Sequence, residues 1–265
     1  MNPKTIDTIV KIVDTLKAQG WNVPPDVDAM ARLQKLKKLR QSGAIKADVI
    51  NRDEIEARLI AVISKNQRAQ LNKLLELLGN PPQLYNVPNE FWENEGRKLQ
   101  RDVEPILIDI YLQQAKLLMD EVHIGIDWGM VNVNAARWAN KYTYDLVKGI
   151  TNTTLKGLQE TIPQFYEQGW NLGQLRTSLE RWYSPARAEM IAITETTRAA
   201  SEGERQLVSE IQKETGIELI AIWNTSNDDI VCDICGPRND QPITDGMYPP
   251  AHVGCRCEVS HRLPE

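Results

Sequence analysis

All four cysteines of this 265-residue chain lie between residues 232 and 257, together with one of its three histidines. The spacing of these side chains is C-x2-C-x16-H-x2-C-x-C, and the residues are Cys232, Cys235, His252, Cys255 and Cys257. A C-x2-C turn directs two thiolates at one point, and H-x2-C repeats that geometry. Two such turns that face each other supply the four nitrogen and sulfur ligands that tetrahedral Zn²⁺ prefers. The spacing therefore predicts a zinc site near the end of the chain.

The five candidate ligands compete for four positions. We favour Cys232, Cys235, His252 and Cys255, because both halves of the site then use the same two-residue turn. Cys257 lies about 6.6 Å beyond Cys255 at the rise of a strand, so it could replace His252 or simply pack. A closed site of four protein ligands leaves no position for an activated water, so the predicted zinc is structural.

Clustered cysteines have three other uses, namely buried packing, a reversible redox dithiol and disulfides. Core cysteines have no reason to gather in one segment, and a redox pair usually opens a helix, whereas Cys235 is followed by Gly236 and Pro237. The first residues lack the apolar core and cleavage site of a signal peptide, and no run approaches the ~20 apolar residues of a membrane span. We therefore expect a cytoplasm-like compartment, where disulfides are disfavoured, and no membrane association.

Two predicted strands frame the cluster. Residues 218–223 are apolar on both faces, as in a covered strand, and residues 255–263 alternate in polarity. In the second strand Cys255, Cys257, Val259 and His261 share one side, and Ser260 lies on the other. We expect His261 to be a core or surface histidine rather than a ligand.

Apolar residues at helical spacing predict helices over most of the remaining chain. These helices are expected at 6–16, 55–78, 103–123, 135–150, 153–168, 172–182 and 185–215. Gly79-Asn80-Pro81-Pro82 should end the second helix, and Pro185 and Gly216 should open and close the last one. The predicted fold class is mainly α, with a helical domain at 1–125 and a second domain at 130–265. The second domain has helices to residue 215 and a small α+β zinc module at 216–265.

The distribution of charged residues along the chain bears on whether the protein binds nucleic acid. Acidic and basic residues balance in residues 1–130, so the net charge of −5 lies in the remainder and disfavours a broad nucleic-acid surface there. The basic stretch at 31–41 is interpreted as a solvated helix face. On the last helix, charged residues at three- and four-residue spacing are interpreted as surface ion pairs: Glu195, Arg198, Glu202 and Arg205.

Two alternatives are a zinc-containing nucleic-acid-binding protein and a zinc-dependent nuclease. A nuclease would need a further acid or histidine beside an open metal site. The nearby acids sit in turn contexts that explain them without chemistry: Asp228, Asp229, Asp240 and Asp245. We therefore expect no enzymatic activity.

From about residue 130 to 265 the sequence resembles the Mu F-like, or phage head morphogenesis, family of minor head proteins. The specific part of the resemblance is an ordered series of segments: ARAEMIAITETTRAAS, AIWNTSNDDIVCDIC and PPAHVGCRC. Thr194, Glu195 and Arg198 match the helix motif of the family. Its loop motif is matched by Asp229, Cys232, Cys235, His252, Cys255 and Cys257. Val253-Gly254 replaces the commoner Pro-Asn and keeps the two-residue turn.

The resemblance implies a minor capsid protein of a tailed phage or prophage that binds the portal protein and acts in head assembly, DNA packaging or ejection. It implies assembly in the host cytoplasm and a place in the virion, in the head interior or at the portal vertex. The major capsid protein, a scaffolding protein and DNA are further candidate partners. Some relatives carry an appended toxin or enzyme domain, and none is expected here. Residues 1–125 match no family motif, and we expect their amphipathic helices to form part of the portal contact.

Overall fold

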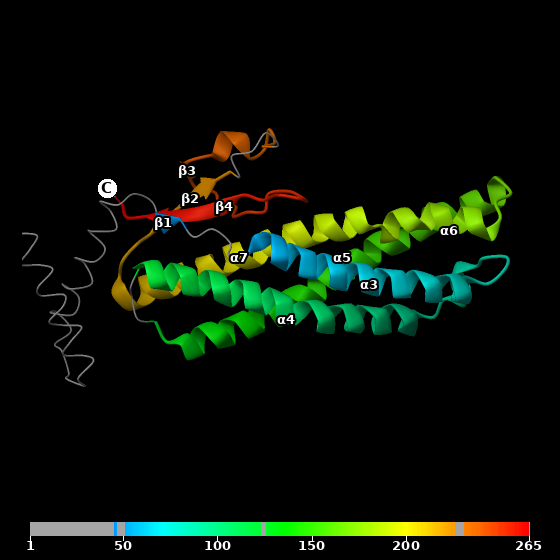
Figure 1. Cartoon of the computed structure of the whole chain (residues 1–265), viewed down its shortest axis with the longest axis horizontal. Coiled ribbons are helices and arrows are strands. Elements are labelled where there is room, and N and C mark those ends of the chain that lie inside the picture. The colour runs from blue at the N-terminus through cyan, green and yellow to red at the C-terminus, as the bar shows by residue number, and fades with distance from the viewer. Residues whose placement is uncertain (1–44, 47–50, 123–125, 226–230, 265) are drawn as a thin grey trace, which may run out of the picture.

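Long helices run side by side in the computed structural model, and a small sheet packs on one side of them (Figure 1). The structure describes residues 45–46, 51–122, 126–225 and 231–264. The long helices are α3 (Arg52–Leu78), α4 (Asn89–Val122), α5 (Trp128–Glu167) and α7 (Pro185–Thr215). The shorter ones are η1 (Leu84–Asn86), α6 (Leu172–Glu180), η2 (Arg181–Tyr183) and η3 (Gly236–Arg238). The mainly α prediction is confirmed, while the predicted helix at 6–16 and the basic stretch at 31–41 lie outside the described residues.

Local signals set the ends of several helices as predicted. Helix α3 ends at Gly79, whose φ of 77° lies in the left-handed region that glycine adopts without strain. Helix α7 begins after Ser184, whose Oγ accepts a hydrogen bond from the backbone N–H of Arg187 at 3.2 Å. It ends at Gly216, with a φ of 69°. These termini confirm the predicted positions of the second and last helices.

Two helices are longer than predicted. Helix α4 begins at Asn89 rather than at 103, and α5 unites the two segments predicted at 135–150 and 153–168. Pro105 and Pro163 lie inside these helices. A proline removes the hydrogen bond to the carbonyl four residues earlier. Here those carbonyls belong to exposed residues, Arg101 and Gln159, where water can take the place of the missing donor.

The helices share continuous apolar cores. One cluster combines Leu59 of α3, Leu107 of α4, Val147 of α5 and Ala192 of α7. Helix α7 also approaches α4 closely at Gly203, where the lack of a side chain permits the contact. A Cβ placed on Gly203 would lie only 2.5 Å from the carbonyl oxygen of Tyr111. Segments from before and after the predicted domain boundary at 125–130 therefore pack together, and the boundary itself stays a prediction.

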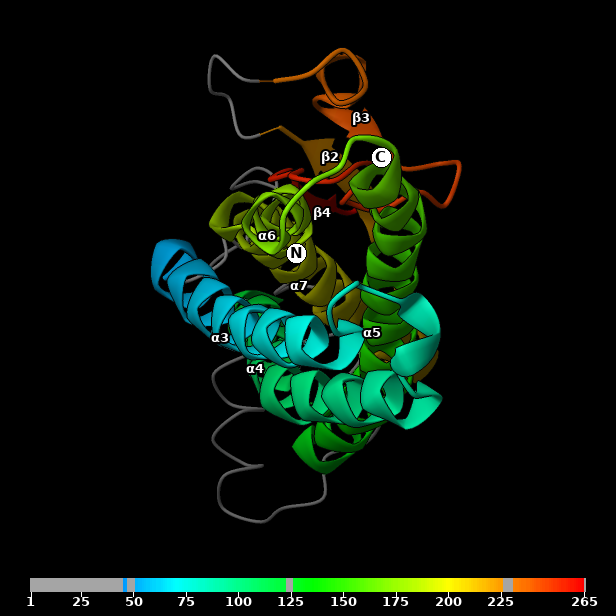
Figure 2. The same cartoon turned by 90° about the vertical axis from the view of Figure 1, so that its right-hand side faces the viewer.

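The sheet has four antiparallel strands within the described residues, in the order β1-β4-β2-β3. The strands are β1 (Ile45–Lys46), β2 (Ile220–Asn224), β3 (Gln241–Pro242) and β4 (Glu258–Arg262). Strands β2 and β4 confirm the two predicted strands that frame the cysteines. The pairing of β1 with β4 brings a segment from early in the chain into the same sheet, which was not predicted. Figure 2 shows the sheet stacked beyond α7, on the side away from α3 and α4.

The central strand β4 corrects one detail of the sequence pattern. Ser260 was placed on the polar side of the strand, yet it is buried, as are its neighbours Val259 and His261. Strand β4 is paired on both edges, and the Asn224 amide donates to the Ser260 hydroxyl at 2.8 Å. His261 is a core histidine, in agreement with the interpretation of the sequence.

Membrane insertion finds no support in the described part of the chain, where every helix is too short or too polar to cross a bilayer.

Candidate metal centre

Two short turns carry the candidate ligands. In the first, the backbone N–H groups of Cys235 and Gly236 donate to the carbonyl of Cys232 at 3.1 and 2.9 Å. In the second, the N–H of Cys255 donates to the carbonyl of His252 at 3.3 Å. Each turn thus brings the side chains at its two ends to one side, as the two-residue spacing predicts. The turns belong to segments that follow β2 and precede β4, so the sheet brings them face to face.

The five predicted ligands lie together as two overlapping triads. Cys232, Cys235 and His252 form one triad, Cys235, Cys255 and Cys257 form the other, and the ligand atoms of each lie within 4.8 Å of one another. The structure thus gathers all five residues and makes Cys235 the shared member. Both His252 and Cys257 lie within reach of a site with the other three cysteines, and the ligand set stays a prediction.

The distances between ligand atoms suit a tetrahedral ion. The His252 Nε2 lies 3.1 Å from the Cys232 sulfur and 3.3 Å from the Cys235 sulfur, and the sulfurs of Cys235 and Cys255 are 3.8 Å apart. A tetrahedral ion with zinc–sulfur bonds of ~2.3 Å places its sulfur ligands about 3.8 Å apart. The same sulfur separation is far from the ~2.05 Å of a disulfide, and all four cysteines are free. The residues therefore fit a thiolate-bound metal ion.

The thiols strongly shift one another's pKa values. A hydrogen bond from the Cys257 thiol lowers the pKa of Cys255 to about 5, and the same pair raises the pKa of Cys257 far above its ordinary value. Burial raises the pKa of Cys235 to about 12. The Cys255 thiolate is thus favoured while Cys235 and Cys257 stay protonated, and repulsion by the Cys255 thiolate adds to the cost of ionising these two thiols. A divalent cation would remove that repulsion and favour further thiolates.

His252 has the tautomer that a ligand needs. Its Nδ1 donates to the carbonyl of Val253 at 2.9 Å, which leaves Nε2 directed at the sulfurs of Cys232 and Cys235. This backbone hydrogen bond is the main cause of a raised pKa for His252. Metal-bound histidines commonly fix their second ring nitrogen in this way.

The charged residues of α7 are only partly as predicted. Glu202 and Arg205 form the expected ion pair at 2.7 Å. Glu195 pairs with Arg198 at 3.5 Å, but its carboxylate is buried and also accepts a 2.6 Å hydrogen bond from the Tyr142 hydroxyl. The prediction of a surface pair was wrong for Glu195, because the packing of α5 on α7 covers this position. Burial raises the pKa of the Glu195 carboxyl.

The acidic residues near the cluster have structural roles where the structure describes them. Asp240 adopts a left-handed turn conformation with a φ of 58°, and Asp245 pairs with Arg238 at 2.9 Å. Asp245 also accepts the backbone N–H of Met247 at 3.0 Å. Asp228 and Asp229 lie outside the described residues. The turn contexts predicted from the sequence are thus observed for the two acids that can be placed.

Sequence reasoning missed side chains that contact the second turn. Thr197 of α7 donates to the carbonyl of Cys255, and Glu56 of α3 binds the side chain of Arg256. Threonine hydroxyls inside helices often bond to backbone groups, but the adjacent Thr196 has no hydrogen-bond partner among the described residues, so no sequence signal singles out Thr197. No local signal marks Glu56, which is 200 residues distant from its partner.

Comparison with protein families matches the C-terminal part of the chain. The profile of the family described as Phage Mu protein F like protein matches residues 156–260. The matched region runs from the second half of α5 into β4, so it contains α7 and both turns of the candidate metal centre. Searches of the curated proteins and of the solved structures found no match.

Proposed function

We propose that this chain, whose residues 156–260 form a phage Mu protein F like domain, is a minor head protein of a tailed phage or prophage. The family match carries the proposal and points to head morphogenesis. Binding to the portal protein, a place in the virion and a role in DNA packaging or ejection are the finer parts of it. In this proposal the metal centre has a structural role: it holds the sheet segments within the matched region against α7.

The proposed ion is Zn²⁺, and its proposed role is structural. Sulfur and imidazole ligands at tetrahedral spacing support zinc, and more than four candidate ligands support a site closed by protein groups. Elemental analysis of the purified protein should find about one zinc per chain. A metal-free preparation in which backbone amides of β2 and β4 still resist hydrogen exchange would contradict a structural zinc.

Portal binding is the partner proposal. Exposed aromatic side chains lie on the helices, including Tyr85, Tyr144 and Tyr166, and aromatic residues are enriched in protein interfaces. Tyr144 also lines a groove of about 370 Å³ between α4 and α5, opposite Trp92. Co-expression with the portal protein of the same phage should give a complex that survives size-exclusion chromatography.

Two variants sharpen that experiment. Deletion of residues 1–44 leaves β1 in place and should weaken the complex if the N-terminal region contributes contacts. Tyr144→Ser should weaken it if the groove is used, whereas Leu172→Ser on the separate helix α6 serves as a control with comparable exposure. A full-length protein that stays unbound would remove the portal part of the proposal and leave the family match.

A zinc-dependent nuclease is the second candidate, and one observation favours testing it. A cleft of about 390 Å³ beside the cluster is lined by both turns and by the exposed carboxylate residue Glu189. We propose that the cleft has no hydrolytic role, so purified protein should leave single- and double-stranded DNA intact with or without added Zn²⁺. Cleavage that disappears with a chelator and in Glu189→Gln would replace the structural proposal with the nuclease. Tight DNA binding that falls steeply with salt would instead support a nucleic-acid-binding role.

A further inference from the structure

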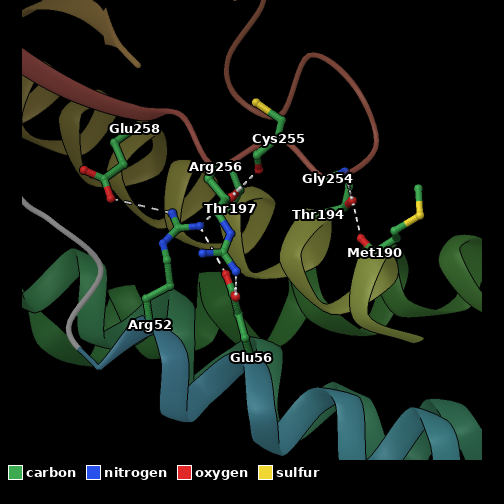
Figure 3. Close-up of polar contacts among 9 residues, drawn as sticks. All are labelled: Arg52, Glu56, Met190, Thr194, Thr197, Gly254, Cys255, Arg256 and Glu258. Carbon is green, nitrogen blue, oxygen red and sulfur yellow. Dashed lines mark hydrogen bonds and ion pairs between the residues drawn. The ribbon is translucent and has the colours of Figure 1, made fainter. Parts of the chain in front are cut away.

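Helix α7 contacts the backbone on both sides of Cys255. The hydroxyl of Thr194 accepts a hydrogen bond from the N–H of Gly254 at 2.8 Å and donates to the carbonyl of Met190 at 2.6 Å. The hydroxyl of Thr197 donates to the carbonyl of Cys255 at 2.7 Å. Figure 3 shows these two threonines on one face of α7, directly beneath the loop that carries Cys255. The backbone N–H of the residue before this cysteine and the carbonyl of the cysteine itself are therefore held by side chains of α7.

Helix α3 contacts the next residue of the same loop. The Glu56 carboxylate accepts a 2.5 Å hydrogen bond from the guanidinium of Arg256, which stands between Cys255 and Cys257. Arg52 joins this network, since it donates to Thr197 at 3.1 Å and pairs with Glu258 at 3.6 Å. Glu56 is only 3 % exposed, so its carboxylate is held inside the contact between α3 and the loop.

These contacts act where the loop has no regular structure of its own. Residues 252–257, here called the ligand loop, precede β4 and make no ladder hydrogen bonds. Polar backbone groups that are buried need partners, and Thr194 and Thr197 supply them on either side of Cys255. Groups that hold metal ligands in place commonly change metal affinity by about 10- to 100-fold when removed.

We propose that Thr194, Thr197 and Glu56 are positioning residues for the metal centre. We also propose that they couple metal binding to the packing of α3 against the ligand loop. This inference rests on the metal binding proposed above. The threonines hold the backbone around Cys255 so that its sulfur faces Cys235, and Glu56 holds Arg256 against α3. Coupling between two sites is reciprocal, so metal binding must stabilise the contact of α3 with the ligand loop to the same extent.

The proposed role of Thr194 and Thr197 can be tested against a matched control residue in the same helix. Thr196 is fully buried between the two residues, and its hydroxyl has no hydrogen-bond partner in the described structure. The experiment measures the affinity for Zn²⁺ by chelator competition and the absorption spectrum of the Co²⁺-loaded protein. Thr194→Val and Thr197→Val should each lower the affinity by roughly 10-fold or more and shift the Co²⁺ spectrum. Thr196→Val should change neither, and Thr194→Ser and Thr197→Ser should restore both.

The outcomes separate this inference from the proposed function. Wild-type protein that binds neither metal overturns both. Wild-type protein that binds Zn²⁺ normally, with unchanged affinity and spectra in both valine variants, overturns the positioning role alone. An equal loss in Thr196→Val, with no rescue by serine, also overturns it, because the effect would then come from packing of α7.

The coupling to α3 is tested by hydrogen exchange on the full chain. Adding Zn²⁺ to metal-free protein should slow exchange at the first turns of α3, around Arg52 to Leu59. In Glu56→Gln the metal should still bind, with lower affinity because the coupling is reciprocal, and this added protection should be lost. Equal metal-dependent protection in the variant and the wild type would overturn the coupling.

Discussion

The helices and the C-terminal sheet are stabilised by different means. The helices share apolar clusters in which leucine, isoleucine and alanine side chains from several elements interlock, including Leu59, Leu107 and Ala192. The sheet module, residues 220–264, has a small cluster whose buried members are Trp223 and three cysteines. So small a core buries too little apolar surface to hold its loops. The difference indicates that packing stabilises the helices, and it is the basis for the proposal that the sheet module depends on a metal ion held by the cysteines.

The largest expected effect is loss of the metal centre. Cys235 belongs to both triads, so Cys235→Ser removes the ligand that any set of four would use. Structural zinc supplies on the order of 10 kcal/mol in small domains, so the sheet module should lose its protection from hydrogen exchange. The helices should keep their circular dichroism signal.

Chelation of the wild-type protein is the matching control for Cys235→Ser. It should reproduce the loss of protection in the sheet module, and added Zn²⁺ should reverse it in the wild type only. Protected amides in β2 and β4 of the variant would show that the sheet module is stabilised by its own packing. The proposed difference between the helices and the sheet module would then be wrong.

A cavity in the helices tests the other half of the comparison. Leu107 is fully buried in α4, so Leu107→Ala should lower the free energy of unfolding by about 2–5 kcal/mol. Leu172→Ala, at a position that is 41 % exposed, should change it by less than about 0.5 kcal/mol. Urea denaturation followed by circular dichroism measures both. The zinc content of Leu107→Ala should stay that of the wild type, because the contacts of α3 and α7 with the ligand loop are left intact. A loss of zinc would show that the metal centre depends on the packing of the helix core as well.

Acid should destabilise the sheet through His261. Burial lowers the pKa of His261 from 6.5 to about 4. The unfolded chain therefore binds a proton that the folded chain excludes between these values, so folded stability falls as the pH decreases through this window. The loss is on the order of 3 kcal/mol.

His261→Gln removes this titration. Urea midpoints of the metal-loaded proteins from pH 7 to 4.5 should converge as the pH falls, because only the wild type gains this acid sensitivity. The metal ligands also take up protons in acid, but they do so in both proteins and cancel in the difference. Parallel curves for the two proteins would show that His261 is not the acid-sensitive group.

The smallest expected effects come from glycines in the helices. Gly203→Ala places a Cβ against the backbone of Tyr111, so α7 and α4 must separate, at a cost of about 1–3 kcal/mol. Gly149→Ala meets no atom within 4 Å on α5 and should instead stabilise the protein by up to about 1 kcal/mol. Thermal unfolding distinguishes the two signs. Equal effects of both changes would argue against the close helix contact at Gly203.

Features that depend on nearby residues could be predicted from the sequence. The glycine and proline signals at Gly79, Pro185 and Gly216 placed helix ends, since capping acts within one turn of the chain. The spacing of the two short turns likewise identified all five residues that gather at the candidate metal centre. The same local reasoning started one helix at 103 rather than at Asn89 and divided α5 between residues 150 and 153, where the helix is continuous.

The tertiary structure decided the features that depend on distant surfaces. Only packing shows that β1 pairs with β4, that Glu195 is covered by α5, and that Glu56 of α3 holds Arg256 of the ligand loop. A charged residue at helical spacing has the same local pattern whether it faces water or a neighbouring element. Its burial is set by which surfaces meet when the chain folds. The sequence by itself therefore determined most of the helices and the five candidate ligands, and the packing of α3 and α7 determined which side chains contact the ligand loop.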